Sequence, residues 1–154
     1  MLIRQDDLTG TEVIELLEEH LRNMRAGSPP ESVHALDLEK LKAPGITVWT
    51  AWHGGLLMGC GAMKELDPRH GEVKSMRTPQ ARRGKGAGRA ILAHIIETAK
   101  GRGCTQLSLE TGSQPGFEPA RALYERFGFI RCGPFGDYRE DPHSSFMRLE
   151  FHAA

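Results

Sequence analysis

The spacing of apolar residues changes several times along the chain, and each change predicts a new element. From residue 11 to 25, apolar side chains recur at the spacing of one helix face, which predicts an amphipathic helix. Thr9 and Glu12 have the spacing of a capping box at its start. A shorter helical pattern from Val33 to Leu41 predicts a second helix.

Alternation of β-branched and aromatic residues replaces the helical period after residue 45. Ile46 to Trp52 and Leu56 to Met63 flank the turn His53-Gly54-Gly55, which is typical of a β-hairpin. A second turn, from residue 67 to 71, leads into a further strand from Glu72 to Thr78. The pattern therefore predicts three consecutive antiparallel strands.

A helical stripe returns from about Gly88 to Lys100 and precedes a short apolar strand, Thr105 to Glu110. A strand, a helix and a strand in this order form a crossover unit, so the two strands should lie parallel in one sheet. The rest of the chain predicts a helix from Pro119 to Phe127 and strands at 129–132 and 145–151. We find no internal repeat or linker, so residues 1–154 should form one mixed α/β domain.

Composition excludes several classes of protein. Hydrophobic residues make up 39% and charged residues 26% of the chain, as in ordinary globular proteins. The 20 basic and 20 acidic residues give no net field to attract nucleic acid or an anionic membrane, and no 18-residue apolar run predicts a membrane span. Three cysteines without a CxxC pair indicate a reducing, cytoplasmic location, and the histidines show no metal-ligand spacing, so we expect no metal.

A glycine-rich segment between a predicted strand and a predicted helix is the strongest chemical signal. It consists of Arg83, Gly84, Lys85, Gly86, Ala87, Gly88 and Arg89. Glycines let backbone N–H groups converge on an anion, and the helix N-terminus adds partial positive charge, so the segment should hold a pyrophosphate. Its spacing fits neither an ATP-binding P-loop nor a dinucleotide fingerprint. The alternatives are a solvated connection and a nucleic-acid contact, although no aromatic residue accompanies the basic cluster.

Two motifs in this order resemble the GNAT family of N-acetyltransferases. Arg83, Gly86 and Gly88 match the family pattern Arg/Gln-x-x-Gly-x-Gly/Ala, and Ala120 to Phe129 resembles its later A-x-x-L-Y-x-x-x-G-F helix. The resemblance implies acetyl-CoA as cosubstrate and a mixed, mostly antiparallel twisted sheet of about six or seven strands, flanked by about four helices. Pro79 lies four residues before Arg83 rather than three, which shifts the loop by one position.

Three further segments are similar to a subgroup of small bacterial acetyltransferases: Ser28 to Leu36, Lys74 to Thr78 and Leu109 to Ser113. The likeness implies an enzyme that acetylates an amine by direct attack in a ternary complex. A small-molecule acceptor is favoured, while a protein amine and a non-catalytic acyl-CoA sensor are the alternatives. Exposed edge strands in such a fold would allow a homodimer.

The resemblance also implies roles for individual residues. An amine with a pKa of about 10 is almost fully protonated at neutral pH, so a base is needed. Glu72 is the first candidate, with a solvated strand position as its alternative, and Glu110 is the second. Tyr124 is expected to protonate the leaving thiolate, although it could be a core aromatic. Met76, Arg77 and Thr78 should offer backbone groups to the pantetheine arm, and an N–H near Met76 should bind the oxyanion.

The segment from Pro29 to His34 should form a wall of the acceptor pocket. Glu31 and His34 could contact the acceptor there, and Arg77 and Arg121 could pair with a carboxylate on it. An ordinary structural role is the alternative for all four residues.

Overall fold

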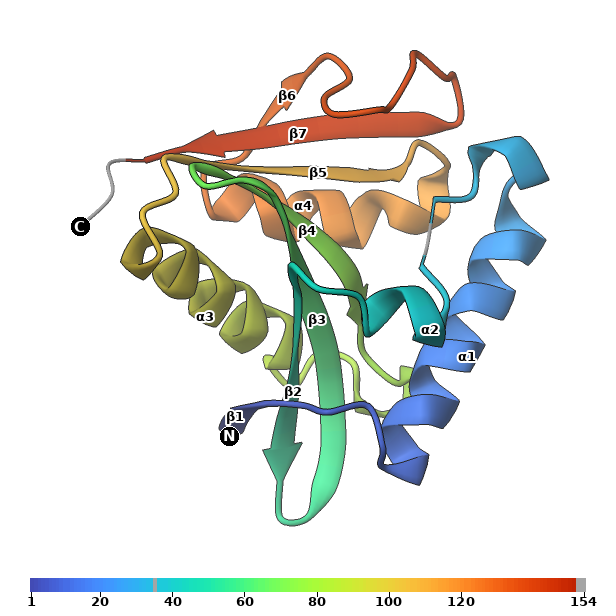
Figure 1. Cartoon of the computed structure of the whole chain (residues 1–154). Coiled ribbons are helices and arrows are strands. Elements are labelled where there is room, and N and C mark those ends of the chain that lie inside the picture. The colour runs from blue at the N-terminus through green and yellow to red at the C-terminus, as the bar shows by residue number, and fades with distance from the viewer. Residues whose placement is uncertain (35, 152–154) are drawn as a thin grey trace.

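A seven-stranded sheet with helices on both faces forms the framework of residues 1–34 and 36–151, which the computed structural model describes (Figure 1). The predicted domain and the Ser28–Leu36 motif also include residues 152–154 and 35, which lie outside this range. The strands are β1 (Leu2–Gln5), β2 (Ile46–His53), β3 (Leu56–Asp67), β4 (His70–Arg77), β5 (Gln106–Gly112), β6 (Ile130–Cys132) and β7 (Ser144–Glu150). The helices are α1 (Thr11–Gly27), α2 (Leu38–Leu41), α3 (Ala87–Gly101) and α4 (Glu118–Arg126), with 3₁₀ turns η1 (Pro30–Ser32), η2 (Gln80–Arg82) and η3 (Pro115–Phe117).

The strands lie in the order β1-β2-β3-β4-β5-β7-β6, and only the β4–β5 pair is parallel among the described strands. Helix α3 makes the connection from β4 to β5, which confirms the predicted crossover. The mixed, mostly antiparallel sheet is confirmed as well. Strand β1 was not predicted, because four residues at a sheet edge are too few to establish a period; it pairs with β2 from Leu2–Trp52 to Gln5–Trp49.

The sheet opens between its two central strands. β4 and β5 pair from His70–Gln106 to Val73–Leu109, and beyond this point each strand continues with its other neighbour alone. An extra residue in β4 opposite β3 accompanies the opening, and Ser75 there has a φ of 55°. Figure 1 shows β4 diverging from β5 below α4. The result is a wedge in the middle of the sheet.

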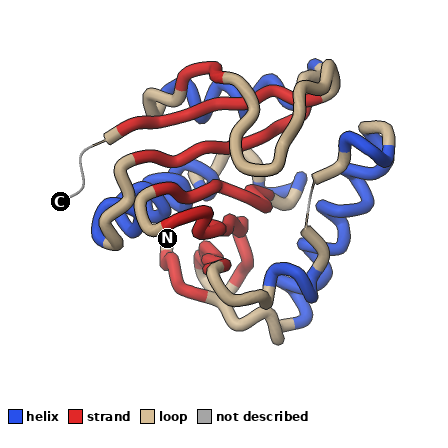
Figure 2. The backbone as a smooth tube through the Cα atoms, turned by 45° about the horizontal axis from the view of Figure 1, so that its top comes forward, coloured by secondary structure: helices blue, strands red, loops and turns tan. Residues whose placement is uncertain are grey.

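Two apolar cores lie on opposite faces of the sheet, so Figure 2 shows the strands between two groups of helices. In β2, Val48 packs with the α1 and α2 side chains, whereas its neighbour Trp49 packs with α3. Ala62 and Met63 of β3 divide in the same way. This alternation follows from the two-residue period of a strand and fixes which residues face the wedge from each side. No helix in residues 1–34 or 36–151 is long and apolar enough to cross a bilayer.

Helix α1 begins at Thr11 as predicted, but its predicted cap and the predicted start of the second helix were wrong. Gly10 is the N-cap of α1 with no side-chain cap, and the Thr9 hydroxyl donates instead to Asp7 at 2.6 Å, so the capping box does not form. The second helix begins only at Leu38, because Asp37 accepts a hydrogen bond from the Lys40 N–H at 2.9 Å and caps it.

Close packing of α3 on β3 depends on Gly61, which predicts a specific sensitivity to mutation. A Cβ at this position would lie 2.5 Å from the Met76 sulfur and 2.7 Å from Ile91 Cγ2. We expect Gly61→Val to reduce the free energy of unfolding by about 1–3 kcal/mol through overpacking, measured by urea denaturation. Gly27→Ala, where an added methyl meets nothing within 4 Å, is the control; equal stability of the two variants would contradict the packing described here.

Candidate active site

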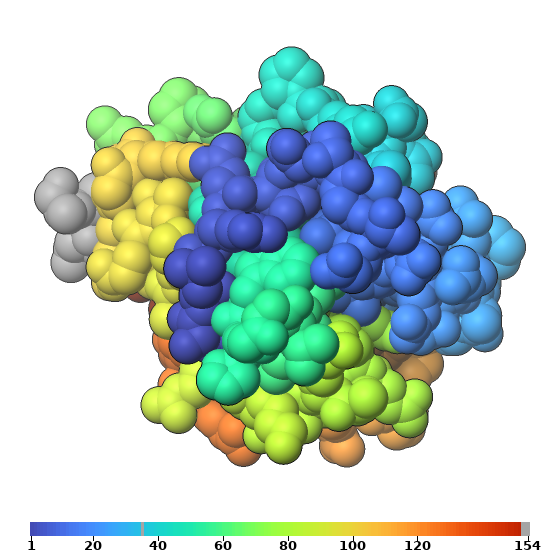
Figure 3. Space-filling model, turned by 90° about the horizontal axis from the view of Figure 1, so that it is seen from below, coloured from blue at the N-terminus to red at the C-terminus, as the bar shows by residue number. Residues whose placement is uncertain are grey.

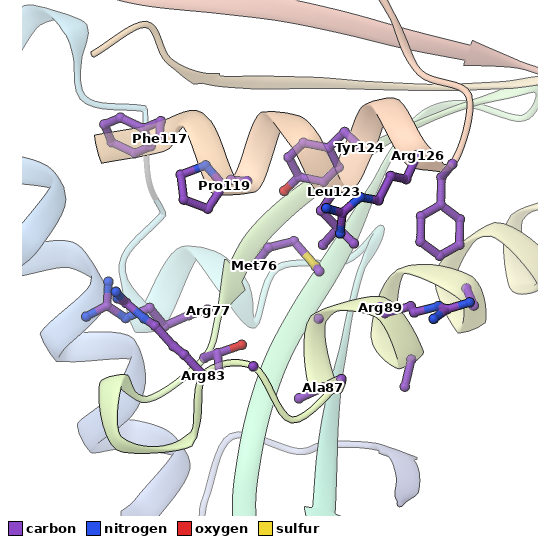
Figure 4. Close-up of a pocket in the computed structure, with 18 of the residues that line it drawn as sticks. Met76, Arg77, Arg83, Ala87, Arg89, Phe117, Pro119, Leu123, Tyr124 and Arg126 are labelled. Atoms are coloured by element: carbon purple, nitrogen blue, oxygen red, sulfur yellow. The ribbon is translucent and has the colours of Figure 1, made fainter. Parts of the chain in front are cut away.

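A cavity of about 1130 Å³ lies beside the end of β4, between the loop and start of α3 on one side and α4 on the other (Figure 4). Nine of the predicted cofactor-binding residues line it: Met76, Arg77, Thr78, Arg83, Gly84, Gly86, Ala87, Gly88 and Arg89. Lys85 is exposed and does not line this cavity. The segment around residues 80–90 reaches the surface between the β2–β3 turn and α4 (Figure 3). The predicted loop and the cavity therefore coincide, apart from Lys85.

The loop has the backbone geometry of an anion cradle. Gly84 and Gly86 have φ values of 77° and 88°, in the left-handed region that glycine adopts without strain. Gly86 is the N-cap of the 15-residue helix α3, and no side chain caps it. Because the first N–H groups of a helix lack intrahelical acceptors, the start of α3 presents donors and partial positive charge to the cavity. Arg83 and Arg89 add full positive charges at its wall.

The two sequence motifs meet across this cavity. A Cβ at Gly88 in α3 would lie 3.3 Å from Leu123 Cδ2 in α4, so the glycine permits close approach of the two helices. Figure 4 shows Pro119, Leu123 and Tyr124 of α4 on one side of the cavity, with the loop before α3 on the other. Met76 extends from β4 between them.

Tyr124 is a buried residue that still borders open space. Its exposed fraction is 6%, its ring packs edge-on against Phe129, and it lines the cavity. Burial raises the pKa of Tyr124 above the ordinary phenol value, so its hydroxyl stays protonated at neutral pH. Tyr124 therefore has a ring that packs in the core and a protonated hydroxyl at the cavity, so its surroundings are compatible with both the core role and the proton-donor role.

A smaller cavity of about 110 Å³ lies beside the first, on the side of α1 and the segment 28–34. Residues that line both cavities are His20, Met24, Met76, Phe117, Ala120 and Tyr124. Two hydrogen bonds hold the 28–34 segment over the smaller cavity: Gln114 Nε2 donates to Ser28 Oγ at 3.1 Å, and Ser32 Oγ donates to Asp141 Oδ2 at 2.5 Å. The arrangement provides two adjoining compartments with a shared wall.

The two candidate bases lie in different surroundings. Glu110 lines the smaller cavity and accepts a hydrogen bond from Ser144 Oγ at 2.7 Å. Burial raises the pKa of Glu110, although the Ser144 hydrogen bond acts in the opposite direction. Glu72, in contrast, is only 3% exposed and lines neither of these cavities.

Glu72 belongs to a closed cluster with Lys74 and Tyr138. Lys74 Nζ donates to Glu72 Oε2 at 3.0 Å and to the Tyr138 hydroxyl at 2.9 Å, and that hydroxyl donates to Glu72 Oε2 at 2.5 Å. Tyr138 comes from the loop between β6 and β7, and burial raises its pKa well above the usual range. Lys74 lines the smaller cavity, so this cluster borders the site without Glu72 reaching it.

Two of the other residues predicted to contact the acceptor, both arginines, already have hydrogen-bond partners within the protein. Arg77 donates to Glu19 of α1 at 2.7 Å, and Arg121 donates to the backbone carbonyls of Gly112 and Gln114 at 2.7 and 3.3 Å. Among the residues expected in this segment, His34 lines the smaller cavity, whereas Glu31 does not.

Sequence reasoning missed His20 and Lys74. His20 is 9% exposed on the buried face of α1, and burial together with the Arg77 charge lowers the pKa of His20 to about 4, so the imidazole is neutral. A polar residue on an otherwise apolar helix stripe was the available signal for His20. For Lys74, the available signal was its two-residue spacing from Glu72, which places both side chains on one face of β4.

The described residues contain neither a cluster of metal ligands nor a cysteine with a lowered pKa. No three His, Cys, Asp or Glu side chains within residues 1–34 and 36–151 converge as metal ligands. Burial raises the pKa of the Cys60 thiol to about 12, and it raises the pKa of Cys104 and Cys132 as well. The thiolate form, which a nucleophile requires, is therefore disfavoured.

Comparison with known proteins identifies the family. The model of the acetyltransferase (GNAT) family matches residues 12–129. The chain is 60% identical to the uncharacterized N-acetyltransferase YsnE of Bacillus subtilis over 96% of this chain and 97% of that one, and 49% identical to the uncharacterized N-acetyltransferase YedL of Escherichia coli over 96% and 92%. A crystal structure from Klebsiella pneumoniae assigned to the acyl-CoA N-acyltransferases is 28% identical, with a TM-score of 0.81 over 97% of both chains. Together with the glycine loop and the α4 motif, these matches show that the chain belongs to the GNAT family and transfers an acetyl group from acetyl-CoA to an amine.

Proposed function

We propose that acetyl-CoA occupies the larger cavity, that a small amine occupies the smaller one, and that transfer takes place at their shared wall. The observation that carries this proposal is the adjacency of the two compartments at Met76 and Tyr124. A volume of about 1130 Å³ suits an extended cosubstrate, and about 110 Å³ suits a group of only a few heavy atoms.

The pyrophosphate is proposed to bind the N–H groups from Gly84 to Gly88 and the charges of Arg83 and Arg89. Lys85 then adds positive charge at the surface of the loop without forming the wall. The pantetheine arm would follow β4 beyond Val73. There β4 remains paired with β3, but its other edge, which faced β5, pairs with no strand within the described residues and can bind the arm. Backbone groups of Met76, Arg77 and Thr78 are the candidates for its amides, with an N–H near Met76 for the oxyanion.

The reaction is proposed to begin when the acceptor ammonium loses a proton to Glu110, directly or through water. Glu110 is favoured over Glu72 because it lines the acceptor cavity, whereas Glu72 is held by Lys74 and Tyr138. The amine nitrogen attacks the thioester carbon, a C–N bond forms, and the C–S bond breaks as the tetrahedral intermediate collapses. Tyr124 donates its proton to the departing thiolate and is reprotonated by the second proton that the nitrogen loses as the amide forms.

A small-molecule acceptor is favoured over a protein amine because the 28–34 segment covers the smaller cavity and is tied to Gln114 and Asp141. The homodimer and the cytoplasmic location stay predictions. Leu2 on edge strand β1 and Ile130 on edge strand β6 are both 60% exposed, so these are the edges where a second copy could pair.

The anion cradle predicts a local effect of a charge placed in the loop. Gly86→Glu introduces a side chain at a φ of 88° and a negative charge beside the pyrophosphate, so we expect acetyl-CoA affinity to fall at least about tenfold in calorimetric titration. Gly55→Glu is the matched control, since it places the same side chain at a φ of 81° in the β2–β3 turn. Equal loss of affinity in both variants would mean that the effect comes from unfolding rather than from the cradle.

The proposed acid predicts a loss of turnover without a loss of binding. Tyr124→Phe keeps the buried ring and removes only the hydroxyl, so kcat should fall by roughly 10²–10⁴-fold in an assay of thiol release. The dissociation constant of acetyl-CoA should stay within about twofold of the wild-type value. A variant with normal kcat would assign Tyr124 to the core alone.

The proposed base predicts the pH profile. Because burial raises the pKa of Glu110, the carboxylate is present only above that raised value, and kcat should fall with decreasing pH at a higher pH than for an exposed carboxyl group. Glu110→Gln should reduce kcat by at least about 10²-fold and remove this acidic limb. A greater loss in Glu72→Gln than in Glu110→Gln would assign the base to Glu72 instead.

A further inference from the structure

Lys74 and Glu110 occupy matching positions at the point where the sheet opens. The last β4–β5 pair is Val73–Leu109, so each of the two charged residues is the next one along its strand. Val73 and Leu109 face the core beside α3, and alternation therefore directs Lys74 and Glu110 to the opposite face, toward α1. Both residues line the smaller cavity. An ammonium group and a carboxylate thus border the same small space.

The position of the Lys74 ammonium is fixed by its partners. Two of its three N–H donors go to Glu72 and Tyr138, and its side chain is only 9% exposed. The Tyr138 hydroxyl also binds Glu72, so the three groups restrain one another. One donor of a nearly immobile cation remains for a ligand in the cavity.

Glu110 retains capacity to accept a hydrogen bond. Its Oε2 accepts from Ser144 at 2.7 Å, and no described residue is hydrogen-bonded to Oε1. The acceptor cavity therefore has an acceptor for an ammonium group and a donor for an anion. Among the described residues that line it, Lys74 is the only lysine or arginine, and the nearby Arg77 and Arg121 are bound to Glu19 and to backbone carbonyls.

A simple alkylamine has no atom that can accept the remaining N–H of Lys74, because its ammonium group only donates hydrogen bonds. A carboxylate on the acceptor would supply that hydrogen-bond acceptor. We propose that the acceptor is a small amino acid, whose amine binds at Glu110 and whose carboxylate binds the free N–H of Lys74. The volume of about 110 Å³ favours a short spacer between the two groups. This inference rests on the proposed function, in which the acceptor occupies the smaller cavity.

The wild-type enzyme provides the first test. Thiol release is measured at saturating acetyl-CoA with a panel of proteinogenic amino acids, each paired with its carboxamide, and with alkylamines. We expect kcat/KM to be at least about tenfold higher for the best amino acid than for its amide. This ratio measures how much more strongly the enzyme stabilises the transition state formed with the amino acid. The amide has the less basic amine, so this preference cannot arise from easier deprotonation. Equal or faster turnover of amides or alkylamines would overturn the inference.

Failure of the proposed function has a different signature. If acetyl-CoA does not bind, the assignment of the larger cavity fails. If acetyl-CoA binds and the enzyme acetylates carboxamides or alkylamines as well as amino acids, only the amino-acid inference is overturned. Should no turnover be detected, calorimetric titration of the same paired panel into the enzyme–CoA complex measures acceptor binding directly. Amino acids that bind at least about tenfold more tightly than their amides support the inference, and absence of this difference overturns it.

Variants of the cluster test the role of Lys74. Lys74→Met is combined with Glu72→Gln, since removing the lysine alone leaves a buried carboxylate without its partner. We expect the amino acid to amide ratio of kcat/KM to fall close to one, mainly through a higher KM for the amino acid, while acetyl-CoA affinity is unchanged. Lys42→Met, which changes a surface lysine paired with Glu39, is the matched control.

Tyr138→Phe supplies a second variant if the double substitution does not fold. It removes one of the two groups that hold the ammonium, so the same ratio should decrease by a smaller factor. A folded cluster variant that keeps the wild-type ratio would overturn the assignment of Lys74 to the acceptor carboxylate.

Discussion

The end of β4–β5 pairing at Val73 and Leu109 is the constraint on which the rest of the site depends. Buried backbone groups need partners, so two strands that part inside a protein leave edges for a ligand or water to satisfy. The bulge at Ser75 lets β4 turn away while it remains paired with β3. Both cavities, the two candidate bases and the Lys74 cluster lie around this opening, and the helices on the two faces of the sheet enclose it from opposite sides.

The two halves of the site use different physical means. At the larger cavity, where we propose that the cosubstrate binds, glycines with positive φ and the start of α3 offer backbone donors, which depend on main-chain geometry more than on side-chain identity. At the smaller cavity, proposed for the acceptor, the wall includes the side chains of Lys74, Glu110 and His34. Buried Tyr124 and neutral His20 lie where the sides join, and they provide polar atoms without a further charge.

The sequence predicts the fold and the position of the glycine loop, but it does not predict the shape of the smaller cavity, for physical reasons. Periodicity and glycine placement are local properties, so the hairpin, the crossover and the segment from Arg83 to Arg89 could be found from neighbouring residues. The smaller cavity depends on contacts between distant segments, such as Lys74 with Tyr138 and Ser32 with Asp141. Strand period places Glu72 and Lys74 on one face of β4, but only the fold distinguishes the residue that lines the cavity from the one that is buried behind it.

The loop between β6 and β7 supplies no residue to the wall of either cavity, but Tyr138 and Asp141 hold two residues that line the smaller cavity, Lys74 and Ser32. Surface loops tolerate substitution and changes of length more readily than the strands they connect. Substitutions in this loop can therefore change acceptor preference without changing the residues that line the larger cavity. Such separation gives one scaffold a route to new amines during evolution, and it marks residues 133–143 as the natural segment for engineering specificity.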